Sequence, residues 1–300
     1  MSNPKLALIP SGYIGGSSPK VYSILPNDGS GDFTFDRNLA TGTRVRKDGL
    51  LETVAADTAR LSWLNADCPS LHLEAQRTNL QTNSETSTGK SLTGATLTNN
   101  QAIAPTGELK AMELKEDTST GKHRFFTGSV LATTSGTAYT LSMFVKKQSS
   151  SRFIFINAGS FMGVSGSFNL DTQAVTGNVQ LFETYPNGWY RIGISATANA
   201  THTSGYFVQL QQGTSDASYT GDESSVFVWG LQFEEGSTFS SYIETDASQT
   251  TRNADVCSVT TPTGVTNITE TFEDDTTNVI TSIPTTYTIS NGKVKKVIMT

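Results

Sequence analysis

Aromatic rings beside an arginine are the side chains of this sequence best suited to binding a sugar. In the stretch 188–191, Gly-Trp-Tyr-Arg, strand alternation places Trp189 and Arg191 on one face. An exposed indole can stack on a sugar ring while a guanidinium donates hydrogen bonds to its hydroxyl groups. Further candidates for such a platform are three tyrosines: Tyr139, Tyr206 and Tyr219. The alternative, which we favour for the Trp and Arg pair, is that Trp189 anchors a core and Arg191 pairs with an acid such as Glu234.

Patterns that indicate catalysis are missing from the sequence. Glu234 and Glu235 are adjacent, and neighbouring residues of a strand point to opposite faces, so the two carboxylates cannot act together as acid and base. No GxSxG motif supports a serine nucleophile. The histidines lack metal-binding spacing and are expected at surfaces or interfaces: His72, His123 and His202. We predict that the chain is not an enzyme, with a polysaccharide hydrolase as the weakest alternative.

Composition and charge narrow the class of protein further. Of the 300 residues, 36% are hydrophobic and only 16% are charged, with Thr, Ser, Asn, Gln and Gly dominating the remainder. Thr and aromatic residues favour strands, while Gly, Asn, Asp and Ser favour turns, so we predict an all-β fold. The net charge of -6 and the pI near 5.1 do not create the basic field that nucleic-acid binding needs.

Targeting signals and cysteines indicate the compartment. No apolar window of about 18 residues predicts a membrane span, and the apolar run at 6–9 is too short for a signal peptide. We therefore expect a chain made in a reducing cytoplasm without a secretion signal. Cys68 and Cys257 are then expected as small buried hydrophobic residues, with a disulfide between them as the alternative.

Three segments with different patterns divide the chain. Residues 1–84 are rich in turn signals and short apolar stretches, which predicts an extended N-terminal arm with small hairpins. Residues 85–256 alternate regularly between Gly and Asn turns, which predicts a β-sandwich. Residues 257–300 are Thr-rich, and Asn291-Gly292 between two alternating runs predicts a terminal β-hairpin that follows an acidic loop at 273–275. Both ends are too small to stand alone and should dock on a partner or on the sandwich.

The middle segment shows the clearest strands. They are residues 139–145, 152–156, 164–170, 189–196, 206–210 and 225–233. In the last of these, alternation places Val226 and Val228 on one face and Trp229 and Leu231 on the other, and Gly230 is expected to mark a bulge or a close approach of another backbone. Sustained helical periodicity is absent, and residues 109–114 could form at most one helical turn.

Several motifs follow one another in an order typical of one family. Residues 32–37 read DFTFDR, residues 42–52 read GTRVRKDGLLE, and residues 68–80 read CPSLHLEAQRTNL. Residues 187–191 read NGWYR, residues 226–236 read VFVWGLQFEEG, and SYI at 241–243 and TRNAD at 251–255 complete the series. Together these motifs, which cover roughly residues 32–256, resemble those of tailed-bacteriophage virion structural proteins of the fibre, tail or head-appendage type. Residues 39–42 are looser than the family pattern, and residues 257–300 match none of its motifs.

This resemblance implies a jelly roll similar to carbohydrate-binding modules, in a virion protein that is often a homotrimer. The implied partners are other virion proteins, namely capsid, portal, tail or fibre, together with further copies of the chain. Carbohydrate-binding jelly rolls often hold a structural calcium ion, for which the candidate ligands are acidic loop residues: Asp171, Asp216, Asp222 and Glu223. Their spacing matches no calcium loop, and we expect no cofactor.

Two functions agree with these observations. The first is a virion scaffold or decoration that attaches through its terminal segments and uses the jelly roll as a rigid spacer. The second is an adhesin that recognises host surface polysaccharide through exposed aromatics of the jelly roll. We place the scaffold first, because both ends need a partner and the aromatics of the motifs suit a core. Neither function involves nucleic acid or membrane insertion.

Overall fold

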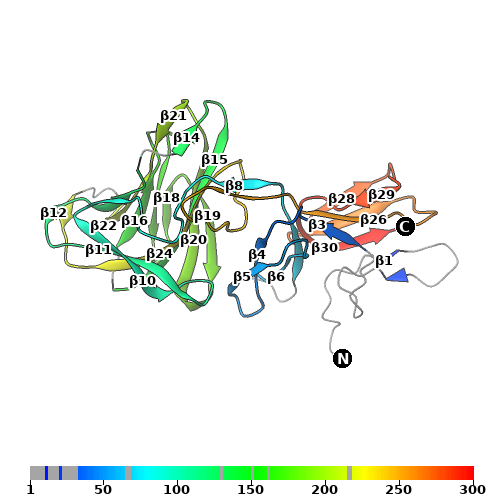
Figure 1. Cartoon of the computed structure of the whole chain (residues 1–300), viewed down its shortest axis with the longest axis horizontal. Helices are drawn as coiled ribbons and strands as arrows, with labels where there is room; N and C mark the ends of the chain where they lie inside the picture. Colours follow the sequence, from blue (N-terminus) through cyan, green and yellow to red (C-terminus); the bar gives the residue numbers. More distant parts are fainter. Residues whose placement is uncertain are drawn as a thin grey trace. The chain divides into compact units, whose positions relative to one another are not determined.

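The computed structural model describes residues 33–64, 69–128, 131–149, 152–160, 162–214 and 218–300, together with the strand residues 11–12 and 20–21. The predicted all-β class is confirmed, since the described elements are strands apart from one 3₁₀ turn at Pro186–Gly188 (Figure 1). The chain forms two compact units. Residues 77–251 make up the sandwich unit, and residues 1–76 with 252–300 make up the end unit.

Two six-stranded antiparallel sheets build the sandwich unit, which agrees with the predicted jelly-roll sandwich. The β15 sheet has the order β10 (Ala95–Ile103), β11 (Leu109–Glu116), β24 (Ser225–Glu235), β15 (Ala138–Lys147), β20 (Trp189–Thr197) and β19 (Val179–Tyr185). The β16 sheet has the order β18 (Val175–Gly177), β17 (Ser165–Asn169), β16 (Phe153–Asn157), β22 (Phe207–Gln211), β13 (His123–Phe126) and β9 (Ser91–Thr93). Shorter pairs join β12 (Thr120–Gly121) to β23 (Tyr219–Thr220), β14 (Leu131–Thr133) to β21 (His202–Ser204), and β8 (Arg77–Asn79) to β25 (Thr250–Arg252).

Alternating side chains of both sheets form the core of this unit. Leu141 and Met143 of β15 are fully buried, and so are Ile154 and Ile156 of β16. Each buried side chain of this size contributes about 1.5–3 kcal/mol through the apolar area it removes from water. All six predicted strand segments are confirmed. The helical turn considered for residues 109–114 is wrong, because that stretch is β11 and hydrogen-bonds to β10 and β24.

A bulge at Gly230 decides which face each residue of β24 occupies. Gly230 has a φ of 63°, and the pairing register of β24 with β15 shifts between Trp229 and Gln232. Val226 and Val228 face the core before the bulge, whereas Leu231 faces it afterwards. The predicted bulge is therefore confirmed. The prediction that Leu231 shares a face with Trp229 is wrong, because the extra residue inverts the alternation.

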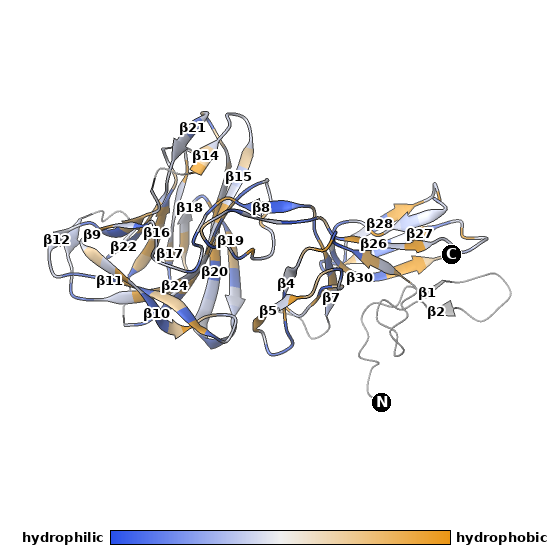
Figure 2. Cartoon of the chain, viewed as in Figure 1, coloured by the Kyte–Doolittle hydropathy of each residue, from blue (hydrophilic) through white to orange (hydrophobic). Residues whose placement is uncertain are grey.

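Three sheets build the end unit. The largest has the order β2 (Lys20–Val21), β1 (Ser11–Gly12), β30 (Gly292–Met299), β27 (Ile268–Phe272) and β28 (Thr277–Ile280), with β7 (Ser70–Leu73) also on β30 and β6 (Leu61–Ser62) on β7. A second sheet has the order β29 (Thr286–Thr288), β26 (Val256–Thr260) and β3 (Thr34–Asp36), and the third pairs β4 (Gly42–Val45) with β5 (Leu51–Val54). As Figure 2 shows, polar and apolar residues mix along β26, β27 and β30, whereas β8 is hydrophilic.

The two ends of the chain share one core, which differs from the predicted separate arm and tail. Leu71 and Leu73 from the N-terminal part pack in the same cluster as Val294 and Met299 from the C-terminal part. Cys257 is fully buried in this cluster, and burial raises the pKa of its thiol to about 12. Cys68 and the first part of the predicted arm, residues 1–32, lie outside the described residues except for β1 and β2.

The predicted hairpin at Asn291-Gly292 is wrong. β29 before this pair hydrogen-bonds to β26, whereas β30 after it hydrogen-bonds to β27, β7 and β1, so the two runs belong to different sheets. The tight hairpin of this region instead joins β27 to β28 through the acidic loop at 273–275. Asp275 takes a φ of 65° there, and Asp274 accepts hydrogen bonds from the backbone nitrogen and hydroxyl of Thr276. No helix of the described residues is long and apolar enough to span a membrane.

Candidate functional site

The outer face of the β15 sheet is covered by the chain's own segments around residues 79–86 and 236–245. Asn79 donates hydrogen bonds to the carbonyl oxygens of Leu231 (3.1 Å) and Ile243 (2.8 Å), and its side-chain oxygen accepts one from the backbone nitrogen of Phe233 (3.0 Å). The Tyr242 ring packs on Trp229 with centroids 4.5 Å apart. These contacts cover the part of this face that surrounds Trp229 and Leu231.

Trp189 and Arg191 are also buried, with exposed fractions of 1% and 5%. The Trp189 indole donates a hydrogen bond to the carbonyl oxygen of Ile103 (3.1 Å), and the Arg191 guanidinium bonds to the Ser142 hydroxyl (3.0 Å). Trp189 thus anchors packed structure, as the alternative interpretation had it. The suggested pairing of Arg191 with Glu234 is wrong, since Glu234 accepts hydrogen bonds from Thr140 and Ser240 instead.

The three candidate tyrosines are also buried, with exposed fractions of 3% for Tyr139, 0% for Tyr206 and 7% for Tyr219. Tyr139 stacks on Phe233 with an interplanar angle of 8°, and Tyr206 belongs to the main core. The Tyr219 hydroxyl donates to the carboxylate of Glu116 (2.5 Å). The five sequence-predicted residues therefore do not form an exposed platform.

Glu116 organises a buried polar cluster at one end of the sandwich. Its carboxylate forms an ion pair with Arg152 (2.7 Å) and accepts a hydrogen bond from the backbone nitrogen of Asp222 (2.9 Å). His123, expected at a surface, is fully buried beside it, because its ring nitrogens bond to the carbonyl oxygens of Gly94 (2.6 Å) and Tyr219 (3.2 Å). Each charged group here has a partner within the cluster, so its role is to fix loops.

The residues considered as calcium ligands face cations of the chain itself. Asp222 pairs with Arg152 (2.9 Å), Glu223 with Lys115 (3.6 Å), and Asp171 with Lys147. Asp216 lies outside the described residues. Within the described part of the chain, no three His, Cys, Asp or Glu side chains come together as a metal site.

The outer face of the β16 sheet carries aromatic and polar side chains that the core does not use. We call the outward side chains of this sheet the open face. Its aromatic members are half-buried phenylalanines: Phe126, Phe153, Phe155 and Phe207. Its other members are Ser91, Thr93, Arg124, Asn157, Ser165, Ser167, Asn169, Thr176, Gln209 and Gln211. Their neighbours along each strand, such as Ile154 and Val208, belong to the core, which sets the orientation.

Strand pairing brings the open-face residues into rows across the sheet. One row runs through Thr93, Arg124, Gln209, Phe155 and Ser167, which are paired on neighbouring strands. In the next row Phe126 is paired with Phe207. The centroids of the Phe155 and Phe207 rings are 6.0 Å apart, and the Arg124 guanidinium lies 4.5 Å from the centre of the Phe207 ring. The open face thus combines flat apolar rings with amides, hydroxyls and one cation.

Gln211 is the member of the open face whose hydrogen bonding is incomplete. Its side chain is paired across the sheet with Phe153 and is only 3% exposed. Its amide oxygen is buried and has no hydrogen-bond partner among the described residues. A buried acceptor without a partner costs roughly 1–3 kcal/mol, and because this oxygen is not exposed, a ligand hydroxyl reaches it only if the neighbouring side chains move.

A sequence signal for this face existed in β16 and β22. Residues 153–156 alternate Phe with Ile, so both faces of the strand are apolar, and one of them cannot be the core of a two-layer sandwich. Phe207 and Gln209 alternate with core residues in the same way. What sequence could not reveal is that the chain covers part of the outer face of the β15 sheet, whereas the phenylalanines on the outer face of the β16 sheet stay partly exposed.

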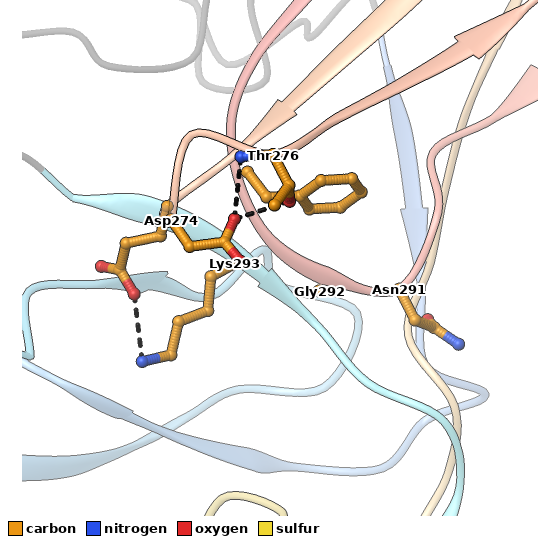
Figure 3. A pocket seen from close by; sticks show the side chains of 7 residues that line it. Asp274, Thr276, Asn291, Gly292 and Lys293 are labelled. Carbon is orange, nitrogen blue, oxygen red and sulfur yellow. Dashed lines mark hydrogen bonds and ion pairs between the residues drawn. The ribbon is translucent and has the colours of Figure 1, made fainter.

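The end unit contains an open pocket of roughly 530 Å³ beside the β27–β28 turn. Figure 3 shows a hydrogen bond between Asp274 and Thr276 and a separate ion pair formed by Lys293, while the Asn291 side chain points away. The partner of Lys293 is Glu273, at 3.1 Å. Since these charged groups already satisfy one another, the pocket offers no free acid, base or nucleophile.

Motif residues of the end unit form a buried ionic network. Asp255 accepts from Arg37 Nε (2.6 Å) and from Arg60, and Glu74 accepts from Arg60 (2.8 Å) and Arg252 (3.4 Å). Burial by itself would raise the pKa of Glu74, but the charges of His72, Arg252 and Arg60 hold it well below its ordinary value. These residues therefore stabilise the fold and are not available to a ligand.

Comparison with known proteins gives only distant likenesses. No family model matches the chain, and no curated protein matches its sequence. Among solved structures, a domain of a bacteriophage CBA120 tailspike protein is similar over 53% of this chain and 21% of its own, with 11% identity and a TM-score of 0.33.

Two further structures come from xylan-degrading systems. A Clostridium thermocellum endo-1,4-β-D-xylanase fragment with a CBM22 module covers 58% of this chain (15% identity, TM-score 0.30). A CBM22 xylan-binding domain of Paenibacillus barcinonensis covers 54% (11% identity, TM-score 0.29). The chain spans about a fifth of the tailspike chain and under a third of the xylanase chain, but nearly the whole xylan-binding domain.

Proposed function

We propose that the protein is a non-catalytic component of a bacteriophage particle that binds surface polysaccharide through the open face. The observation that carries the proposal is the set of half-buried phenylalanines on the outer face of the β16 sheet, interleaved with amides and hydroxyls. Phe155 and Phe207 supply flat apolar surface for the CH faces of sugar rings. Asn157, which is paired with Phe207 and partly exposed, supplies an amide for sugar hydroxyl groups.

The absence of catalysis is supported by the state of the buried acids. Among the described residues, Glu116, Glu234 and Asp255 are each held by two or more hydrogen-bond or ion-pair partners. None of the open-face residues is acidic. A glycosidase of the usual kind needs two carboxyl groups flanking one bond, and the open face offers none.

Assignment to a phage particle rests on the resemblance of the motifs. The residues of these motifs lie in buried networks that have structural roles, which fits a virion component without catalysis: Arg37, Glu74, Asn79, Glu234 and Asp255. Location in the virion and a homotrimeric state belong to the same proposal. Mass spectrometry of purified particles and light scattering of the purified chain test these two points.

A microbial glycan array probed with the full chain tests the binding function. We expect Phe207→Ala to weaken the strongest signals by about threefold to tenfold, since one aromatic stacking contact is worth about 0.5–1.5 kcal/mol. The matched control is Phe227→Ala, which removes a half-buried phenylalanine from the outward side of the β15 sheet. A correctly folded protein that binds no glycan, or equal losses for both variants, would contradict the proposal.

A virion scaffold is the second candidate, favoured by the construction of the end unit. Both ends of the chain enter one core, and Glu74, which follows β7, forms ion pairs with Arg60 and with Arg252 of the TRNAD segment. Such a unit could serve as a rigid attachment module. If the scaffold function were the main one, particles carrying Phe207→Ala would assemble normally, whereas Asp255→Asn would lower the amount of this protein in purified particles.

A further inference from the structure

The open face differs in charge from the chain as a whole. The whole chain carries 27 acidic against 21 basic residues, excluding histidine. The outward residues of the β16 sheet nevertheless include no Asp or Glu, and Arg124 is their single charged member. A face that excludes carboxylates in an acidic protein avoids repelling an anion.

Arg124 also differs from most arginines of the chain in its partners. Six arginines form ion pairs with carboxylates: Arg37, Arg44, Arg46, Arg60, Arg152 and Arg252. No acidic side chain among the described residues pairs with Arg124. Its guanidinium instead lies over the face of the Phe207 ring, 4.5 Å from the ring centre. The ring holds the guanidinium in place without neutralising it. Its planar set of donors matches a carboxylate or a phosphate.

The neighbours of Arg124 complete a site for a charged sugar. Thr93 is paired with Arg124 on one side, and Gln209 is paired with it on the other. The exposed Thr93 hydroxyl suits a sugar hydroxyl, whereas Gln209 is buried; the Phe207 ring beside the guanidinium suits the apolar side of a sugar ring. Among the described outward residues of this sheet, no carboxylate is present to accept hydrogen bonds from sugar hydroxyls.

We infer that the open face selects an anionic polysaccharide, with the Arg124 guanidinium binding its carboxylate or phosphate group. This inference rests on the proposed function, because it names the class of ligand for the same site. The anionic group has two sources, a uronic acid in a capsular polymer or a phosphodiester in a teichoic acid, and the Arg124 fork fits both.

Isothermal titration of the full chain against four polymers tests the inference. Polygalacturonate presents carboxylates, glycerol-phosphate teichoic acid presents phosphodiesters, and xylan and dextran are neutral. We expect at least one anionic polymer to bind more tightly than both neutral ones. Its affinity should fall when the ionic strength is raised from about 0.05 to 0.5 M, because a half-exposed ion pair is screened.

Arg124→Gln should weaken binding of the anionic polymer by roughly tenfold to a hundredfold, since a hydrogen bond to a charged group is worth about 1.5–3 kcal/mol. Arg46→Gln removes the same charge from an exposed position of the end unit and should leave the affinity unchanged. Thermal unfolding of both variants checks that they fold, and Arg124→Lys, which keeps the charge but loses the fork, should recover part of the loss.

Different results would contradict the anionic ligand class and the glycan-binding function. If a neutral polymer bound as tightly as the anionic ones, and its binding depended on Phe207 but not on Arg124, the inference would be overturned while the open face remained a glycan site. If Arg46→Gln weakened binding as much as Arg124→Gln, the attraction would come from overall charge, which also overturns the inference. If Phe207→Ala changed no binding at all, the proposed function itself would fall.

Discussion

Asp255 is the acceptor on which the ionic network of the end unit depends. Its fully buried carboxylate accepts hydrogen bonds from Arg37 Nε at 2.6 Å, from the backbone nitrogen of Glu74 at 2.9 Å, and from Arg60. Asp255→Asn keeps the size of the side chain but removes one of the two carboxylates that face three buried guanidinium groups. The remaining positive charge would then be only partly compensated.

The expected loss of stability is large. Removing one partner of a buried ion pair costs about 3–5 kcal/mol, because the other charge stays buried without compensation. The end unit, with residues 1–76 and 252–300, lies between the two size classes for which each kcal/mol lowers the Tm by about 4–8 °C and about 2–4 °C, so roughly 4 °C per kcal/mol applies to it. We therefore expect the Tm of the end unit to fall by about 12 °C or more in Asp255→Asn.

Differential scanning calorimetry of the full chain measures this change, with the sandwich unit as an internal reference. Asp48→Asn is the matched control, since Asp48 pairs with Arg46 at 2.7 Å in the same unit but both side chains are about half exposed. An exposed pair contributes about 0–1 kcal/mol, so the control should shift the Tm by only a few degrees. Equal shifts in the two variants would refute the view that the motif residues stabilise this unit.

Two further predictions concern pH and backbone conformation. The pKa of Glu74 is held well below its ordinary value of 4.5 in the folded state, so its contribution to stability is present above pH 4.5 and is lost as pH falls. We therefore expect the urea midpoint of the end unit to drop between about pH 5 and 3. The drop should be smaller in Glu74→Gln, which lacks the titrating carboxyl group. A drop of the same size in Glu74→Gln would show that other groups cause it. Gly230→Ala places a Cβ 2.9 Å from the Phe144 ring at a φ of +63°, whereas Gly89→Ala has a similar φ of +74° and open space. Both should lose about 1–2 kcal/mol to backbone strain, and Gly230→Ala at least about 1 kcal/mol more from overpacking, as measured by denaturant unfolding; equal losses would show that the bulge can repack.

The alternation of polar and apolar residues predicted the strands of the sandwich well. It did not predict which strands, far apart in the sequence, pair with one another. The segments 139–145 and 225–233 became β15 and β24, because their pattern depends only on neighbouring residues. The Asn291-Gly292 pair has the composition of a hairpin turn, yet β30 pairs with β27 and β7 instead. Partners that offer more buried apolar contact override turn preference.

In the candidate site, too, residue types were predictable from the sequence but their burial was not. Trp189 and Tyr206 are the residue types that bind sugars, but burial decides whether they can, and burial depends on which segments cover each sheet. The Asn79 hydrogen bonds that fasten the cover of the β15 sheet join residues more than 150 positions apart, at Leu231 and Ile243. The open face was visible only as the double-sided apolar pattern of residues 153–156.

Nuclear magnetic resonance of the full chain with the tightest-binding oligosaccharide of the glycan array tests whether the open face binds the ligand. We expect chemical-shift changes to concentrate on β16, β22 and β13, with the largest changes at Phe155, Phe207 and the Asn157 side-chain amide. Changes that concentrate on the pocket beside Lys293, or on the segments that cover the β15 sheet, would contradict the assignment of the open face as the ligand site.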